Sequence, residues 1–166
     1  MSTLIAVTLY AVTMTLANLS VATWGPWVSP INACIFIGLD LSLRDWLHVR
    51  LKTWHMGVLI ASASLLTYAL NPSAGKIATA SACAFLLSSL VDWAVFSKLR
   101  GSWLARSNWS NIAGAAVDSL VFPTLAFGAL MPGIIALQFA AKVAGGAVWA
   151  IAIARLSNKR ALQTAA

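Results

Sequence analysis

Two ionisable residues lie inside strongly apolar stretches of the sequence, where a charge is costly. Asp118 stands in "AGAAVDSLVFPTLAF" and Lys142 in "LQFAAKVAGGAVWA". A charge in such surroundings normally faces an opposite charge or a polar cavity. Asp118 and Lys142 can therefore form a buried ion pair, and such a pair can have either of two roles. It can hold two helices in register, or it can bind a polar ligand; we favour the ligand site.

The spacing of these two residues supports their pairing. The chain turns near Leu130, and both Asp118 and Lys142 lie 12 residues from that position. With a rise of about 1.5 Å per residue, two antiparallel helices would bring the side chains to nearly the same height. Pro123 removes the amide that would bond the carbonyl of Ser119, and so leaves an acceptor free beside Asp118.

The remaining acidic residues belong to two polar segments. Asp92 precedes Lys98 by six positions and has serines on its own helical face. Asp40 and Arg44 are spaced as an i,i+4 acid–base pair, which would neutralise itself on one helix. Asp45 follows Arg44 directly, which makes "LSLRDWLH" a dense polar cluster for a helix end.

The sequence shows no set of residues for catalysis. It contains no phosphate-binding loop, because "PSAGK" is a lone Gly-Lys pair, and its two histidines lack metal-ligand spacing. No Ser/His/Asp set can be assembled. We therefore expect a protein that is not an enzyme and needs no metal and no cofactor.

Composition indicates where these polar residues reside. The chain has 166 residues, of which 60% are hydrophobic and 9% are charged, whereas soluble domains carry about 25% charged residues. Apolar runs of this length are typical of transmembrane helices. We predict an all-α, polytopic membrane protein, a six-transmembrane-helix bundle forming a single domain over residues 1–166. The predicted spans are residues 4–23, 31–48, 53–70, 77–96, 109–127 and 132–154.

Basic residues set the predicted orientation. They concentrate in the second and fourth connections and in the C-terminal tail, whereas Lys76 alone lies on the opposite side. This asymmetry predicts that both termini lie in the cytoplasm. We expect the protein to be located in the inner (cytoplasmic) membrane. The net charge of +7 then indicates contact with the anionic headgroups of the lipid bilayer and no nucleic-acid partner.

The run "RSNWSNIAGAAVDSLVFPTLAFG" resembles a hallmark of the vitamin uptake transporter family, whose members include queuosine precursor transporters. Arg106, Asn108, Ser110, Asp118 and Phe122 occupy its positions. "DWAVFSKLRG" and "GLDLSLRDWLH" resemble two further family segments, and Lys142 resembles a lysine of the last span. The resemblance covers residues 36–155. The sequence differs from the family pattern at two places. Ala115 stands where the family commonly has Gln, and "WLHVR" follows Asp45 where the family continues with an acidic residue, Tyr and Gly.

This resemblance implies an importer of 7-deazaguanine bases, either 7-cyano-7-deazaguanine or 7-aminomethyl-7-deazaguanine. An aspartate would accept hydrogen bonds from the base edge, with Asp118 the first choice, and aromatic rings would stack on the base. The substrate-binding residues are expected among Asp118, Lys142, Asp92, Asp45, Arg44, Arg106, Asn108, Ser110, Gln138, Phe122 and Trp149. The sequence leaves open two alternatives: a substrate-capture subunit for another vitamin-like solute, and a non-transport membrane protein. It also leaves open whether the chain forms a homo-oligomer.

Overall fold

The structure, a computed structural model, describes residues 2–48 and 50–164, and these are helical with no strand among them. The helices are α1 (Thr3–Trp24), η1 (Pro26–Val28), α2 (Ser29–Asn32), η2 (Ala33–Ile37), α3 (Gly38–His48), α4 (Thr53–Leu70), η3 (Pro72–Ala74), α5 (Gly75–Lys98), α6 (Trp103–Phe127) and α7 (Pro132–Thr164).

Local sequence sets the ends of these helices. The side chain of Ser102 caps the N-terminus of α6 by accepting a hydrogen bond of 3.2 Å from the amide of Ala105. Gly128 ends the same helix in a left-handed conformation, with φ of 74°. Ser2 caps α1 in the same way as Ser102 caps α6, and Gly25 ends α1 with φ of 77°. The apolar runs therefore start and stop at residues that suit helix termini.

The second membrane segment is continuous from Pro26 to Leu47 but changes its winding along the way. Its centre, η2, is a π-helix, and Gly38 follows it directly. Gly38 lies against the backbone of Gly145 and Gly146 in α7, so two helix backbones touch there. The Ser42 hydroxyl donates a hydrogen bond of 2.9 Å to the carbonyl of Gly146 and fastens the same contact.

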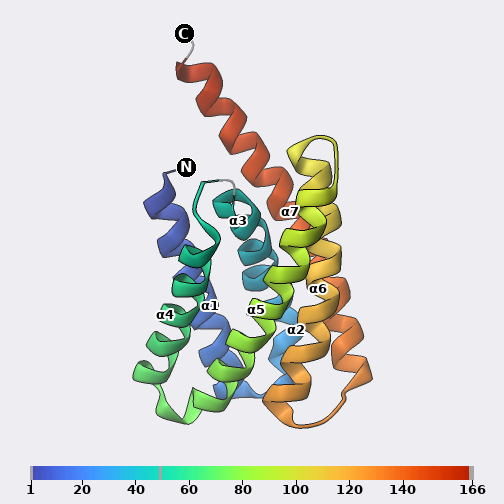
Figure 1. Cartoon of the computed structure of the whole chain (residues 1–166). Coiled ribbons are helices and arrows are strands. Elements are labelled where there is room, and N and C mark those ends of the chain that lie inside the picture. Colours follow the sequence, from blue (N-terminus) through green and yellow to red (C-terminus); the bar gives the residue numbers. More distant parts are fainter. Residues whose placement is uncertain (1, 49, 165–166) are drawn as a thin grey trace.

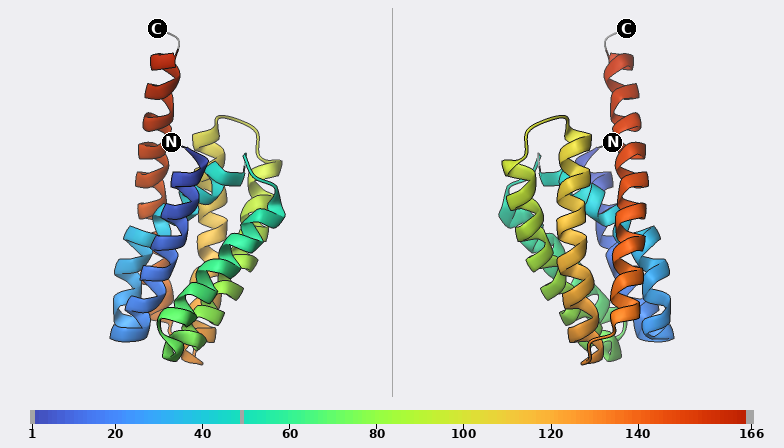
Figure 2. Two further views of the ribbon diagram at one scale, coloured as in Figure 1. Left: turned by 90° about the vertical axis from the view of Figure 1, so that its left-hand side faces the viewer. Right: turned by 90° about the vertical axis from the view of Figure 1, so that its right-hand side faces the viewer.

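The helices run side by side as an antiparallel bundle (Figure 1). α5 and α6 form its most extensive pair, and α7 packs against α6 and α3. The start of α1 and the end of α7 lie at the same end of the bundle, together with the α3–α4 and α5–α6 connections. The last turns of α7 extend beyond the other helices (Figure 2). Both chain ends therefore emerge on one side, and on that side lie most of the basic residues.

Polar and apolar side chains are distributed as a bilayer requires. All four acidic residues of the chain are buried, together with Arg44 and Lys142, whereas many large apolar side chains are exposed on the outside. Among the exposed side chains are Leu65, Leu90 and Val148. In water this arrangement would be unfavourable, but in lipid the apolar side chains face hydrocarbon and the polar ones face each other.

The prediction of an all-helical membrane bundle is confirmed. Five segments are long and apolar enough to cross a membrane, and Trp54–Leu70 in α4 is a shorter apolar helix. The predicted boundaries differ from the observed ones at three places. The second segment begins at Pro26 and not at residue 31, because residues 26–32 are already helical. Residues 103–108 were assigned to a connection because they include Arg106 and Asn108, but the Ser102 cap starts α6 there. α7 continues to Thr164, ten residues beyond the predicted end at 154.

Candidate functional site

Asp118 on α6 and Lys142 on α7 form the predicted ion pair. Lys142 Nζ lies 2.6 Å from Asp118 Oδ2, and both side chains are almost completely buried. Lys142 also donates hydrogen bonds to the Ser119 hydroxyl, at 3.1 Å, and to Gln138 Oε1, at 2.8 Å. The lysine thus makes contacts to both helices of the hairpin. Ser119 binds Lys142 through its hydroxyl, so the side chain of that residue contributes to the site.

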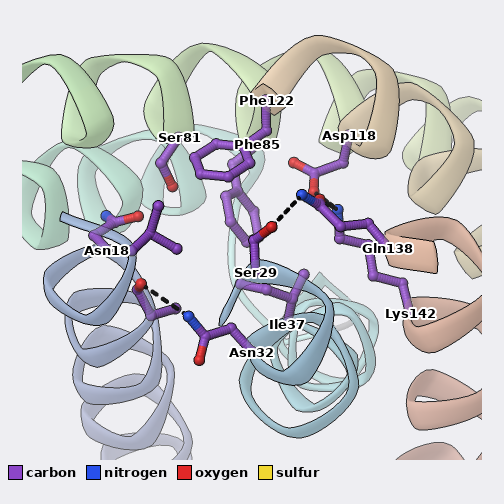
Figure 3. Close-up of a pocket in the computed structure, with 12 residues that line it drawn as sticks. Asn18, Ser29, Asn32, Ile37, Ser81, Phe85, Asp118, Phe122, Gln138 and Lys142 are labelled. Atoms are coloured by element: carbon purple, nitrogen blue, oxygen red, sulfur yellow. Dashed lines mark hydrogen bonds and ion pairs between the residues drawn. The ribbon is translucent and has the colours of Figure 1, made fainter. Parts of the chain in front are cut away.

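Asp118, Lys142 and Gln138 form one wall of a cavity inside the bundle (Figure 3). Gln138 extends from Lys142 towards α2, where its amide nitrogen donates a hydrogen bond of 2.9 Å to the Ser29 hydroxyl. On the far side, Asn32 donates to the Ser20 hydroxyl at 2.5 Å. The cavity is lined by Ala17, Asn18, Val21, Ser29, Asn32, Ile37, Ser81, Phe85, Asp118, Phe122, Gln138 and Lys142.

The cavity combines aromatic and hydrogen-bonding surfaces. Phe85 from α5 and Phe122 from α6 supply rings, whereas Asn18, Asn32 and Gln138 supply amides. The cavity volume is only about 20 Å³, room for about one water molecule. A bicyclic ligand is several times larger than a water molecule. Lining side chains must therefore move before such a ligand can bind.

One oxygen of the central carboxylate is left without a partner. Asp118 Oδ2 contacts Lys142, but Asp118 Oδ1 is buried and has no hydrogen-bond partner in the structure. Leaving a buried acceptor unsatisfied costs about 1–3 kcal/mol, and more for a charged group. A ligand that donates a hydrogen bond to Asp118 Oδ1 would remove this cost.

A second polar cluster is centred on Arg44 in α3. Its Nη2 lies 3.2 Å from Asp92 Oδ1 on α5, and its Nη1 donates to the hydroxyls of Ser88 and Ser89, each at 3.1 Å. The predicted Asp40–Arg44 pair is therefore wrong, because Arg44 turns to α5 and leaves Asp40 behind. The planar guanidinium can serve several acceptors on the neighbouring helix at once, which a contact along its own helix would not allow.

Asp45 and α6 complete this cluster. The Ser107 hydroxyl on α6 donates a hydrogen bond to Asp45 Oδ2, and Asp45 also interacts electrostatically with Asp92 and Arg44. Gly114 gives the cluster room, because a Cβ at this position would lie 2.9 Å from Arg44 Nη2. The cluster thus joins α3, α5 and α6, and it contributes no residue to the lining of the cavity.

The other predicted site residues lie outside the cavity. Arg106 donates two hydrogen bonds, of 3.0 and 2.8 Å, to the carbonyl of Phe96 at the end of α5. Asn108 bonds to the carbonyl of Leu104 and Ser110 to the carbonyl of Ser107, both within α6. Trp149 is partly buried against the apolar core. Of the eleven predicted residues, the structure brings Asp118, Lys142, Gln138 and Phe122 together at the cavity.

The structure also adds residues that the sequence analysis did not single out. Asn18, Asn32 and Ser81 are polar residues within predicted spans, so their positions held a usable signal. Ser29 lies in the turn-like sequence "WGPWVSP", outside the predicted spans, so the sequence assigns it to a connection. Phe85 had no distinguishing signal, because an aromatic residue in a span faces lipid as readily as a cavity.

Together, the fold and the site define a multi-pass helical membrane protein with a small cavity inside its bundle, lined by both polar and aromatic side chains. A family described as "Putative vitamin uptake transporter" matches residues 2–154 of the chain. The chain belongs to this family of transporters. No match was found among curated proteins, and none among solved structures.

Proposed function

We infer that this chain imports a queuosine precursor, 7-cyano-7-deazaguanine or 7-aminomethyl-7-deazaguanine, across the cytoplasmic membrane. Membership of the vitamin uptake transporter family supports transport of a small solute. The resemblance of the segment around Asp118 to queuosine precursor transporters supports this substrate class. The observation that carries the proposal is the free, buried oxygen of Asp118 inside a cavity with aromatic walls.

The cavity residues suit the chemistry of a guanine-like base. Its edge carries N–H donors, which Asp118 Oδ1 accepts, and a carbonyl oxygen, which meets Lys142 or the amide of Gln138. Phe122 and Phe85 provide faces on which a flat ring stacks. Because the cavity is small, the bundle must widen around it to admit the base.

The orientation of the proposed importer follows from charge. The end of the bundle that carries the chain termini holds the connections with Arg50, Lys52, Lys98 and Arg100. Under the positive-inside rule this end faces the cytoplasm. The cavity residues of α1 and α2 then lie in the half of the bundle that faces away from the cytoplasm.

Direct binding to purified protein tests this proposal. Both 7-deazaguanines are expected to bind, with guanine as the competing control, and Asp118→Asn is expected to weaken binding by about 2–5 kcal/mol, which is at least about 30-fold in Kd. The matched control is Asp92→Asn, which neutralises an equally buried aspartate outside the cavity and should preserve the affinity.

Two results would overturn the proposal or the role of Asp118. Equal affinity for guanine would remove the assigned substrate class, and unchanged affinity in Asp118→Asn would remove this residue from the site. Uptake by cells that cannot make the precursor provides the parallel measurement, provided that the variants insert at the level of the unaltered chain.

A further inference from the structure

The interior of the bundle carries more negative than positive charge. Among the residues whose burial the structure describes, four aspartates are buried, and Arg44 and Lys142 are the buried basic residues. Four carboxylates against two cations leave two negative charges without compensation. Burying an unpaired charge costs several kcal/mol, so the interior has a strong tendency to take up positive charge.

Asp40 is the acidic residue most clearly without a cation. Asp92 is paired with Arg44 and Asp118 with Lys142, whereas Asp40 is in contact with the Thr13 hydroxyl of α1. Asp40 is 0% exposed, and its Oδ2 has no hydrogen-bond partner among the residues that the structure describes. The hydroxyl of Tyr10, one turn before Thr13 on α1, is also buried and without a partner.

Thr13 gives the Asp40 carboxylate only one, shared hydrogen-bond donor. Its hydroxyl oxygen lies 2.8 Å from the carbonyl of Leu9 and 3.1 Å from that of Tyr10, in addition to its contact with Asp40 Oδ1. A hydroxyl has a single hydrogen to donate. The Thr13 hydroxyl donates to Asp40 Oδ1, so one donor is shared among three acceptors and Asp40 Oδ2 receives no hydrogen bond from the described residues. A carboxylate with so few donors and no ion pair is stabilised most simply by a proton, because a bound proton needs no further ligands.

Asp40 also lies where a coupling residue would have to lie. It interacts electrostatically with Asp118 of the cavity and with Arg44 of the second cluster, and Tyr10 faces it from α1. Lys142 on α7 is engaged by Asp118, and α4 carries its titratable His55 and Tyr68 near its two ends. A change of charge at Asp40 therefore alters the electrostatic energy of both Asp118 in the cavity and Arg44 in the second polar cluster.

We propose that Asp40 is a proton-binding site that couples substrate movement to proton movement across the membrane. A proton enters from one side and forms an O–H bond on the Asp40 carboxylate. The same O–H bond breaks after the bundle has opened to the other side, and the proton leaves there. No other bond changes. The coupling to uptake rests on the proposed function, whereas the proton site itself does not.

The proton site can be tested without any substrate. Infrared spectra of the purified protein at neutral pH should contain the carbonyl band of a protonated, buried carboxyl group. Asp40→Asn should lose the part of this band that belongs to Asp40, and Asp40→Glu should shift that part, whereas Asp92→Asn should retain it because Asp92 is ion-paired with Arg44. Any part that remains in Asp40→Asn is assigned to Asp45, the other buried aspartate that has no ion pair among the described residues. An unchanged band in Asp40→Asn, or no such band in the unaltered protein, would overturn the site.

Coupling is tested in proteoliposomes with radiolabelled 7-cyano-7-deazaguanine. Exchange of labelled for unlabelled base, with no gradient, reports on the proposed function alone. Accumulation under an imposed pH difference reports on coupling, and one proton per base predicts about tenfold accumulation for each pH unit. Asp40→Asn should still exchange base but should fail to accumulate it.

The outcomes separate the two ideas. No binding and no exchange would contradict the proposed substrate and leave the infrared result to decide the proton site. Exchange without proton-driven accumulation in the unaltered protein would overturn coupling and leave the proposed function standing. Accumulation driven by a sodium gradient in its place would also overturn the assignment of a proton.

Discussion

Lys142 Nζ and Asp118 Oδ2 lie 2.6 Å apart across the α6–α7 hairpin, at a point where neither side chain is reached by solvent. The contact uses one carboxylate oxygen and leaves Oδ1 facing a cavity without a partner. Asp118 therefore neutralises the lysine with one oxygen and keeps a second acceptor free beside the cavity.

Breaking this pair from one side should be costly. Lys142→Met leaves Asp118 buried without a cation, and we expect the free energy of unfolding to fall by about 3–5 kcal/mol. The double variant Asp118→Asn with Lys142→Met should recover most of that loss, because it removes both charges of the pair. Reversible unfolding in detergent micelles measures the cycle, and Lys76→Met, at an exposed lysine, is the control. Equal stability of the Lys142 and Lys76 variants would contradict the prediction.

Two neighbouring glycines of α7 should respond oppositely to alanine. A Cβ on Gly145 would collide with the carbonyl oxygen of Cys34 in η2, whereas a Cβ on Gly146 would meet Asn111 at an ordinary 3.6 Å. Gly145→Ala should lower the free energy of unfolding by about 1–3 kcal/mol through overpacking. Gly146→Ala should be neutral or slightly stabilising, because alanine favours the helix. Thermal unfolding of both variants checks the contrast, which similar midpoints would contradict.

Arg44 should not be replaceable by lysine. The guanidinium reaches Asp92, Ser88 and Ser89 from one rigid fork, and a single ammonium group cannot span those three acceptors. Arg44→Lys should cost about 1.5–3 kcal/mol of unfolding free energy, the contribution of a charged hydrogen bond. Arg155→Lys, at an exposed arginine, is the matched control. A stability equal to that of the control would show that charge alone matters in this cluster.

Phe122 should contribute to affinity if a planar base occupies the cavity. Stacking of a base on an aromatic side chain contributes about 1–3 kcal/mol, so Phe122→Leu should raise the Kd for a 7-deazaguanine by about 5–150-fold. Trp109→Leu removes an aromatic ring that is 63% exposed on the same helix, and it should leave the Kd unchanged. Equal effects of the two substitutions would place the base elsewhere.

Much of the architecture was readable in the chain. Apolar run length predicted the helical membrane bundle, and the equal distance of Asp118 and Lys142 from one turn predicted their contact, because sequential antiparallel helices have a simple register. The segment from Arg106 to Phe127 also predicted membership of the transporter family, which the family match confirms. These features depend on local sequence or on neighbouring helices alone.

The tertiary structure decided the rest. Arg44 forms its ion pair with Asp92 and not with Asp40. This pairing depends on the rotation of α3, which follows a π-helical segment and packs through Gly38 against Gly145. The cavity likewise needs side chains from α1, α2, α5, α6 and α7, whose relative rotation no short spacing encodes. Sequence by itself determined which polar groups enter the membrane. Only packing determined which of them form ion pairs, and left Asp40 without an ion pair among the described residues.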